Sequence, residues 1–253
     1  MRKLLLSATA AILLMSGSAF AAGDAPKPAA QKWSFSGIFG TYDRAQLRRG
    51  FKVYKEVCSA CHSLNLVAYR NLMDIGFSEE EVKAIAGEYE YKDGPNDDGE
   101  MFDRPGKPSD RFKAPFENEQ AARAGNNGAN PPDLSLMVKA RLRGPDYLHG
   151  LLTGYKKDAP KGVTLPDGMS YNTYFPGHQI AMAPPLSDEA VEYTDGTKPT
   201  LDQHSRDIVT FLAWTASPEL EERKRLGIKV LLFLLVLTGM LFALKRRIWS
   251  DLH

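Results

Sequence analysis

The spacing of hydrophobic residues predicts a helix directly before the only two cysteines of the chain. The apolar positions recur at steps of four, three and four residues, at Leu47, Phe51, Tyr54 and Cys58. This is the spacing of one face of an α-helix. Asp43 followed three residues later by Gln46 is a capping pattern, and it places the start of this helix. The face that packs inward therefore ends at a cysteine.

Further along the chain, helical and irregular stretches alternate. We expect helical structure from Ser63 to Ala86, where Ser78 caps a first turn of three glutamates. Residues 87–130 are rich in turn residues and poor in periodicity. Two more helical faces are indicated by Leu134, Met137 and Val138 with Arg141, and, behind a cap at Thr200, by Ile208, Phe211, Leu212 and Thr215.

The two ends of the chain carry apolar runs of different kinds. Residues 1–21 have a basic start, a short apolar run and an A-x-A ending, which is the pattern of a cleavable secretory signal peptide. Residues 227–244 form an apolar run interrupted only by Lys229. At 1.5 Å per residue this run covers roughly 27 Å, about the thickness of the hydrocarbon layer. It predicts one transmembrane anchor helix.

These runs divide the chain into a signal peptide, a globular domain at residues 22–226, the anchor and a tail at residues 245–253. Basic residues flank the anchor on both sides, so the distribution of positive charge does not decide its orientation. The signal peptide does decide it, because it directs the export of the domain behind it. We expect the domain in the periplasm, on a bacterial cytoplasmic membrane, with the tail in the cytoplasm.

The charge balance of the exported part is acidic. The chain has 32 Lys and Arg and 31 Asp and Glu, but six of these basic residues and only one acidic residue lie in the signal, anchor and tail. Residues 22–228 therefore carry a balance of −4. This argues against nucleic acid as a partner and favours a basic protein. Candidate docking patches are Glu79-Glu80-Glu81 and Asp97-Asp98.

The chemistry of the chain centres on Cys58-Ser59-Ala60-Cys61-His62. The C-x-x-C-H pattern is the attachment site of a c-type haem, in which two thiols form thioether bonds and the histidine binds the iron. A zinc site would need four ligands, and so would have to recruit distant histidines. A redox-active dithiol typically opens a helix after a strand, whereas a helix precedes this motif. We therefore expect one covalent haem c.

A second iron ligand is suggested by Met182, on a loop stiffened by Pro184 and Pro185. By composition alone it has several rivals, namely Met73, Met137, Met169, His149, His178 and His204. Arg141, at the end of an apolar face, has two interpretations. It forms a surface ion pair, or it holds a haem propionate by a charge-assisted hydrogen bond. The spacing leaves both open.

Beyond these motifs, the chain resembles the cytochrome c1 family, the haem subunits of quinol–cytochrome c reductase (the cytochrome bc1 complex). The resemblance covers essentially the whole mature chain. Five segments carry it, at residues 46–62, 126–135, 151–155, 174–185 and 223–227.

The resemblance implies a mostly α-helical, class I c-type cytochrome domain with long loops, plus the C-terminal transmembrane helix. It implies that Cys58 and Cys61 hold the haem, that His62 and Met182 are the axial ligands and that Arg141 binds a propionate. The other haem-pocket positions that match are Asn126, Pro131, Pro132, Tyr147, Phe175 and Pro185.

The function implied is that of an electron carrier without a catalytic site of its own. It would take electrons from a Rieske iron–sulfur protein and pass them to a soluble cytochrome c, in a dimeric complex with cytochrome b. Two alternatives stay open, an anchored donor cytochrome that serves an oxidase and a membrane-tethered thiol–disulfide oxidoreductase.

Overall fold

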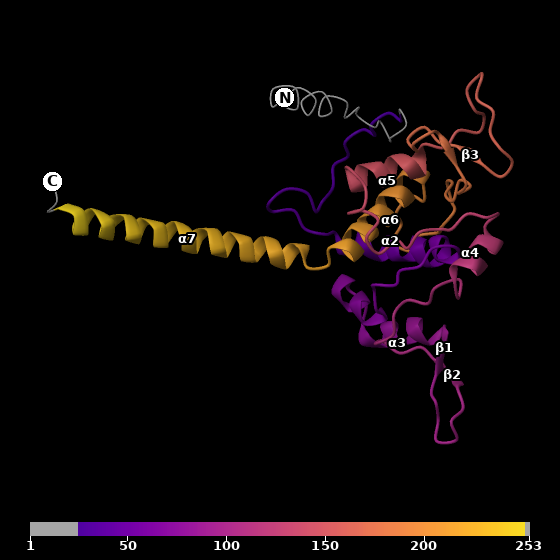
Figure 1. Ribbon diagram of the computed structural model, residues 1–253, viewed down its shortest axis with the longest axis horizontal. Coiled ribbons are helices and arrows are strands. Elements are labelled where there is room, and N and C mark those ends of the chain that lie inside the picture. Colours follow the sequence, from indigo (N-terminus) through magenta and orange to yellow (C-terminus); the bar gives the residue numbers. More distant parts are fainter. Residues whose placement is uncertain (1–24, 251–253) are drawn as a thin grey trace, which may run out of the picture.

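The computed structural model describes residues 25–250, so the predicted signal peptide and the last three residues lie outside the described part. The chain is mostly helical, with one long helix that leaves the domain (Figure 1). The α-helices are α2 (Arg44–Glu56), α3 (Glu79–Gly87), α4 (Glu119–Gly125), α5 (Gly144–Thr153), α6 (Leu201–Ala216) and α7 (Leu220–Trp249). Short 3₁₀ helices span Cys58–Ala60 and Tyr69–Ile75. Two antiparallel strand pairs join β1 (Glu90–Asp93) to β2 (Phe102–Pro105) and β3 (Ser170–Tyr171) to β4 (Gln179–Ile180).

The core lies where α2 crosses α6. Gly50 of α2 allows this crossing, because a Cβ atom there would come within 2.1 Å of the Asp207 carbonyl oxygen. Arg49 of α2 also bonds the buried Asp207 carboxylate at 2.9 Å. The helices bury a shared apolar set that includes Leu47, Phe51, Tyr54, Ile208, Phe211, Leu212 and Trp214. The predicted faces of both helices are therefore confirmed.

The predicted helix starts are confirmed as well. The Asp43 side chain accepts a hydrogen bond from the Gln46 backbone N–H at 3.1 Å, and the Thr200 hydroxyl accepts one from Gln203 at 3.2 Å. Ser78 and Glu81 form a reciprocal capping box at the start of α3. Each cap satisfies backbone donors that a helix N-terminus leaves without partners.

One helical prediction holds in part and another is wrong. Residues 63–86 are helical at Tyr69–Ile75, as a 3₁₀ helix, and in α3, and Gly76, with φ of 97°, separates the two; the segment before Tyr69 is not helical. The segment from Leu134 to Arg141 forms turns, and the helix of this region, α5, begins only at Gly144. A Cβ on Gly144 would come within 1.8 Å of the Val138 carbonyl oxygen, so the chain folds back on itself at this point.

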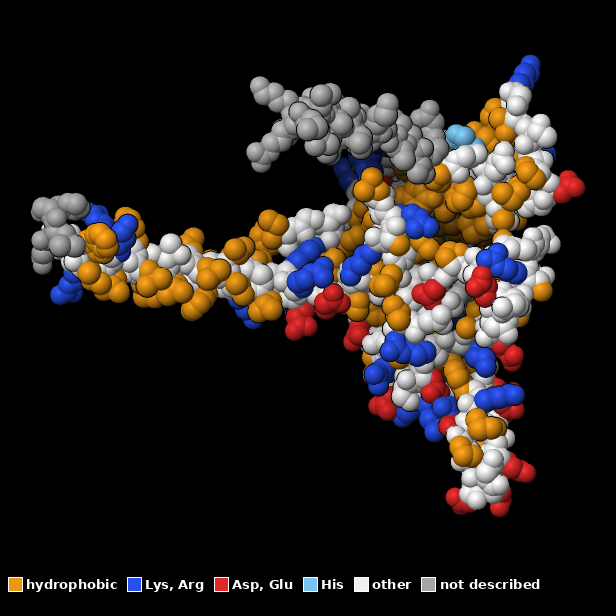
Figure 2. Space-filling model, viewed as in Figure 1, with side chains coloured by type: hydrophobic (Ala, Val, Ile, Leu, Met, Phe, Trp, Pro, Cys, Tyr) orange, Lys and Arg blue, Asp and Glu red, His pale blue; other side chains and the backbone are white. Residues whose placement is uncertain are grey.

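Residues 87–130 hold more structure than their composition predicts. They contain the β1–β2 hairpin and helix α4. The hairpin extends away from the helices (Figure 1), and acidic side chains gather at its tip (Figure 2). Its strands are largely exposed, so they lack the alternating apolar pattern by which a half-buried strand is predicted.

Helix α7 contains the whole predicted anchor. It runs for 30 residues with a mean hydropathy of 2.4 over its most apolar window, and none of that window is buried in the domain. It is long and apolar enough to cross a membrane. One apolar C-terminal helix of this kind is what the sequence predicts.

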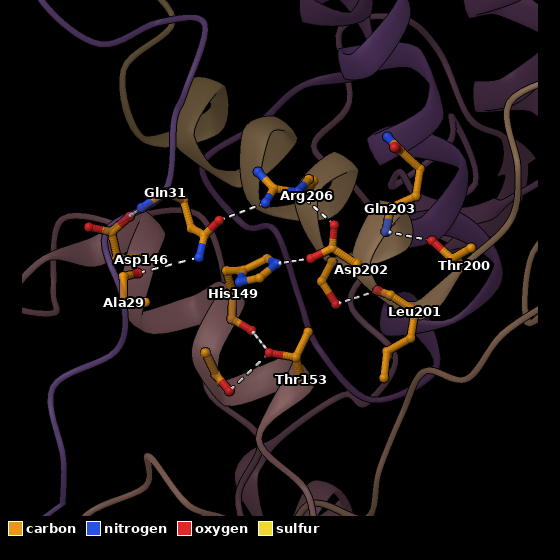
Figure 3. Close-up of polar contacts among 12 residues, drawn as sticks. Ala29, Gln31, Asp146, His149, Thr153, Thr200, Leu201, Asp202, Gln203 and Arg206 are labelled. Atoms are coloured by element: carbon orange, nitrogen blue, oxygen red, sulfur yellow. Dashed lines mark hydrogen bonds and ion pairs between the residues drawn. The ribbon is translucent and has the colours of Figure 1, made fainter.

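A polar network ties the N-terminal arm to α5 and α6 (Figure 3). Gln31 receives a hydrogen bond from Arg206 of α6 at 2.6 Å, and its backbone N–H donates to Asp146 of α5 at 3.0 Å. His149 of α5 bonds Asp202 of α6 at 2.8 Å. These contacts hold α5 in place against α6.

Candidate haem-binding site

The cysteine motif lies directly after α2, in a tight turn. The backbone N–H groups of Cys61 and His62 both donate to the Cys58 carbonyl, at 3.1 and 2.9 Å. Both cysteines are free of disulfide bonds; Cys58 is half-buried and Cys61 is exposed. The turn therefore presents two thiols from one short segment, as thioether attachment to a single ring requires.

The ring of His62 is oriented by a backbone contact. Its Nδ1 lies 2.8 Å from the Pro132 carbonyl oxygen. Because a carbonyl only accepts hydrogen bonds, Nδ1 carries the proton and Nε2 keeps its lone pair. Burial lowers the pKa of His62, which favours this neutral form. A neutral imidazole fixed through one nitrogen is ready to bind a metal through the other.

The loop that supplies the Pro132 carbonyl is fastened to the chain after His62. Ser63 Oγ and the Asn65 backbone N–H donate to the Asp133 carboxylate at 2.8 and 2.7 Å. The Leu134 N–H donates to the Ser63 carbonyl at 2.9 Å. These bonds connect residues about 70 positions apart in the sequence, and they set the distance between His62 and its carbonyl partner.

Asp133 stays ionised in this arrangement. Burial raises its pKa, but hydrogen bonds from Asn65, Ser135 and Ser63 outweigh burial, so the pKa lies below its ordinary value. Sequence reasoning gave Asp133 no role in the site. Its position directly after Pro131-Pro132 was a signal, since aspartate often accepts hydrogen bonds from backbone N–H groups in turns.

A second group of predicted residues lies around the segment at residues 174–185 that carries Met182, here called the methionine loop. The Tyr155 hydroxyl donates to the Met182 carbonyl at 3.1 Å. Tyr147 is close enough to Tyr155 to affect its titration: burial raises the pKa of Tyr155, and Tyr147 adds to the rise. Burial also raises the pKa of Tyr147, and the charge of neighbouring Arg141 offsets part of that rise. Tyr147 thus lies near both Arg141 and Tyr155, and sequence reasoning missed the contact that Tyr155 makes with Met182.

All three rival histidines have structural partners. His149 is buried and bonds Asp202 at 2.8 Å. His204 is fully buried, with its Nδ1 2.8 Å from the Tyr193 hydroxyl. His178 is half-buried, with its Nδ1 3.2 Å from the Asn172 carbonyl. Among the rival methionines, Met137 is buried in the core and Met73 is exposed.

Only some of the remaining predicted pocket residues lie near the cysteine motif. Asn126 caps the end of α4, where its amide donates to the Ala122 carbonyl at 2.7 Å. Pro131 and Pro132 border a cavity of about 440 Å³ beside Cys61. Phe175 and Pro185 are half-buried on the methionine loop. Within residues 25–250, neither Phe175 nor Pro185 forms a hydrogen bond with His62.

Helix α6 holds both groups of residues in one domain. It packs against α2, which ends at the cysteine motif, and against α5, whose following residues include Tyr155. Thr215 of α6 also donates to the Ser135 carbonyl at 3.3 Å. Figure 2 shows a hollow rimmed by hydrophobic side chains, between the part of the surface that carries α5 and β3 and the part that carries α2 and α4.

These features fit a haem. Two free thiols, a histidine with one nitrogen fixed and the other available, and an arginine near Tyr147 are donors that suit a c-type haem. They fit a redox dithiol less well, because burial, with a smaller contribution from Cys61, raises the pKa of Cys58 to about 12. Thiol–disulfide exchange depends on a thiolate.

Comparisons with known proteins point to one family. The model of the cytochrome C1 family matches residues 33–252. A cytochrome c1 of Rhodospirillum rubrum is 52% identical over 236 residues, covering 87% of each chain. A mitochondrial cytochrome c1 heme protein of Arabidopsis thaliana is 55% identical over 221 residues, which cover 87% of this chain and 71% of the relative.

A longer relative is also similar. Cytochrome b/c1 of Bradyrhizobium diazoefficiens is 50% identical over 248 residues; the match covers 90% of this chain but only 36% of that relative. The region that matches the family includes the cysteine motif, the methionine loop and helix α7. With its donor set and its long apolar C-terminal helix, the chain belongs to the cytochrome c1 family, the haem subunits of the bc1 complex in electron transport.

Proposed function

We propose that this chain carries one covalent haem c and relays electrons from a Rieske iron–sulfur protein to a soluble c-type cytochrome. The haem would be held by thioether bonds to Cys58 and Cys61, with His62 and Met182 as the ligands of its iron. The observation that carries this proposal is the hydrogen bond from His62 Nδ1 to Pro132, directly behind two free thiols. It leaves Nε2 as the metal-binding nitrogen.

The residues of the chain have separate tasks in this function. A haem c supplies a one-electron couple, and a thioether ligand favours its reduced form. Pro132 fixes the tautomer of His62, and Tyr155 holds the backbone of Met182. With His62 and Met182 both bound to the iron, the chain would leave no coordination position for a substrate. Arg141 provides a positive charge for a propionate near Tyr147.

The setting of the function is inferred from the family and from α7. Members are subunits of the bc1 complex, so this chain works with other subunits. We propose that these are cytochrome b and the Rieske protein, that the complex is dimeric, and that the domain at residues 22–226 lies in the periplasm. Residues 227–244 would be the anchor, and residues 1–21 would be removed after export.

Covalent attachment is tested first on the purified membrane complex. Acid–acetone extraction should leave the haem on the polypeptide, and the band should stain for haem on a denaturing gel. The Cys58→Ser and Cys61→Ser variants should each keep at most one thioether bond. Clean extraction of haem from the unchanged chain would disprove the attachment.

The role in the complex is tested by its partners. A reduced-minus-oxidised spectrum should show a c-type haem, and a cytochrome b and a Rieske protein should co-purify. Co-purification with a terminal oxidase instead would favour the anchored donor cytochrome. A preparation without a haem spectrum would favour the thiol–disulfide oxidoreductase.

A further inference from the structure

The segment from Trp33 to Thr41, here called the Trp33 loop, is closed by its own backbone. The Ser36 N–H donates to the Trp33 carbonyl, and the Thr41 N–H donates to the Ser34 carbonyl, both at 3.1 Å. Gly40 lies so close to Ser36 that a Cβ on it would come within 2.0 Å of the Ser36 carbonyl oxygen. The loop therefore has a defined shape that depends on a glycine at its end.

The Trp33 loop divides its apolar residues between the core and the surface. Phe35 is buried, with its ring centroid 5.2 Å from that of Tyr42. At the tip, Ile38 is 69% exposed and Phe39 is 85% exposed. Two adjacent large apolar side chains held in water forgo the favourable transfer that burial would give each of them. Such a pair is suited to an apolar partner.

The loop is fastened to the beginning of α7. Lys224 Nζ donates to the carbonyl oxygens of Phe35 and Gly40, at 2.7 and 2.8 Å. Glu221 accepts a hydrogen bond from the Tyr42 N–H at 2.8 Å. Figure 1 shows the indigo loop beside the first turns of α7. The position of the loop along the axis of α7 is thus fixed by two helical residues on successive turns.

This position lies at the expected membrane surface. Lys224 precedes the start of the apolar run, Gly227, by three residues, which is about 4.5 Å along the helix axis. Arg223, Arg225 and Lys229 surround this level of the helix, and their long side chains suit the lipid headgroup region. Apolar residues at an interface are buried about 5–10 Å deep, at the boundary of headgroups and acyl chains.

We propose that Ile38 and Phe39 insert into the phospholipid leaflet on the side of the domain, as a second membrane contact beside α7. This inference rests on the proposed anchoring of the chain by α7. Lipid is the occupant that the structure favours, since the exposed pair belongs to a loop that Lys224 holds, three residues before the apolar run of α7 and among its basic residues. Two separate contacts would restrict rotation of the haem domain about the helix axis.

Photo-crosslinking in native membranes tests this contact. Three variants of the full chain carry the photoreactive residue p-benzoylphenylalanine, Phe39→p-benzoylphenylalanine at the loop tip and the same change at Phe102 and Phe233. Phe102, 44% exposed on the β1–β2 hairpin, is the control away from the membrane, and Phe233, 64% exposed in the apolar run, tests the anchor. After irradiation, mass spectrometry of the purified chain identifies the adducts.

We expect phospholipid adducts at position 39 and position 233, and none at position 102. The absence of a lipid adduct at position 39, or a cross-link from it to another polypeptide, overturns the proposal. The result at position 233 then distinguishes the proposed loop contact from the proposed anchoring by α7. Lipid adducts there would show that the anchor stands and only the loop contact fails, whereas their absence would count against the proposed anchoring as well.

Discussion

The Asp133 carboxylate accepts a hydrogen bond from Ser63 Oγ at 2.8 Å, although 70 residues separate the two in the chain. The same carboxylate accepts from the backbone of Asn65 and of Ser135. It therefore joins the segment after the cysteine motif to the loop whose Pro132 carbonyl orients His62. One residue that lies outside the predicted donor set thus determines the geometry of the proposed iron ligand.

Replacing this carboxylate should destabilise the domain. In Asp133→Ala, the donors of Ser63, Asn65 and Ser135, which are at most partly buried, lose their acceptor. A fully buried donor without a partner costs about 1–3 kcal/mol. We expect a loss of about 2 kcal/mol, equivalent to a fall of about 4–8 °C in Tm for a domain of this size. Thermal unfolding of the detergent-solubilised chain measures it. Asp97→Ala, on the exposed hairpin tip, is the control and should leave Tm unchanged; equal losses in both variants would contradict this role.

The crossing of α2 and α6 should not tolerate a methyl group at Gly50. In Gly50→Ala, the new Cβ would lie 2.1 Å from the Asp207 carbonyl oxygen and 2.7 Å from Phe211 Cβ. Overpacking of this kind costs roughly 1–3 kcal/mol, since two helices must move apart. The control is Gly87→Ala, at the end of α3, where the space is open. We expect a lower Tm only for Gly50→Ala, and an unchanged Tm there would show that the helices separate freely.

The sequence predicts those parts of this fold that depend on neighbouring residues. The face of α2, the caps at Asp43 and Ser78 and the long apolar C-terminal helix all follow from patterns within a few turns of helix. The order of the elements between these parts does not follow from such local patterns. Leu134 to Arg141 has helical spacing, yet it forms turns, and the Leu134 N–H donates to the Ser63 carbonyl, which is distant in the sequence.

In the candidate site, too, local patterns predict some features, whereas contacts between distant residues determine others. The cysteine motif is local, and five residues are enough to identify it. Asp133 and Tyr155 act on residues distant in the sequence, Ser63 and Met182, so no short pattern reveals their roles. The ligand roles of His62 and Met182 stay predictions.

Acid should weaken the domain partly through Asp195. A hydrogen bond from the Thr197 N–H and the Arg49 guanidinium hold the pKa of Asp195 at about 2. Since an unfolded aspartate titrates near pH 3.9, this carboxylate stabilises the fold above about pH 4, and the contribution is lost as the pH falls towards 2.

Asp195→Asn should therefore be less stable than the unchanged protein at pH 7, and the difference should shrink as the pH falls from about 5 to 2. Tm measured across this range checks both points. The Tm of Asp97→Asn should change with pH in the same way as the Tm of the unchanged protein. A constant difference for Asp195→Asn at every pH would show that the ionised form contributes nothing.

Docking of a basic cytochrome c should depend on salt, because the mature domain carries a balance of −4. Of the two candidate patches, Glu79 and Glu81 already pair with Lys83 and Arg48. We thus expect the tip residues Asp97 and Asp98 to contribute more. Replacing both with asparagine should lower the bimolecular electron-transfer rate at low ionic strength more than Glu79→Gln does. Electron-transfer rates that do not change between low and physiological salt would show that electrostatic attraction does not drive docking.

The sulfur of Met182 should set the redox potential. Met182→Leu keeps most of the side-chain volume but removes the proposed thioether ligand, so the reduced iron loses a favoured donor and the potential should fall. Each fall of about 59 mV shifts a one-electron equilibrium about tenfold, and quinol-driven reduction of cytochrome c should collapse. Redox titration and the sulfur-to-iron charge-transfer band measure the change.

Covalent haem and membrane insertion should survive in Met182→Leu, because neither depends on the sixth ligand. Met73→Leu is the matched control, since Met73 is exposed, and it should keep the potential. Tyr155→Phe, which removes only the hydroxyl that holds the Met182 carbonyl, should weaken the charge-transfer band less than Met182→Leu does. An unchanged potential and an intact band in Met182→Leu would exclude this ligand and direct attention to Met169 or His178.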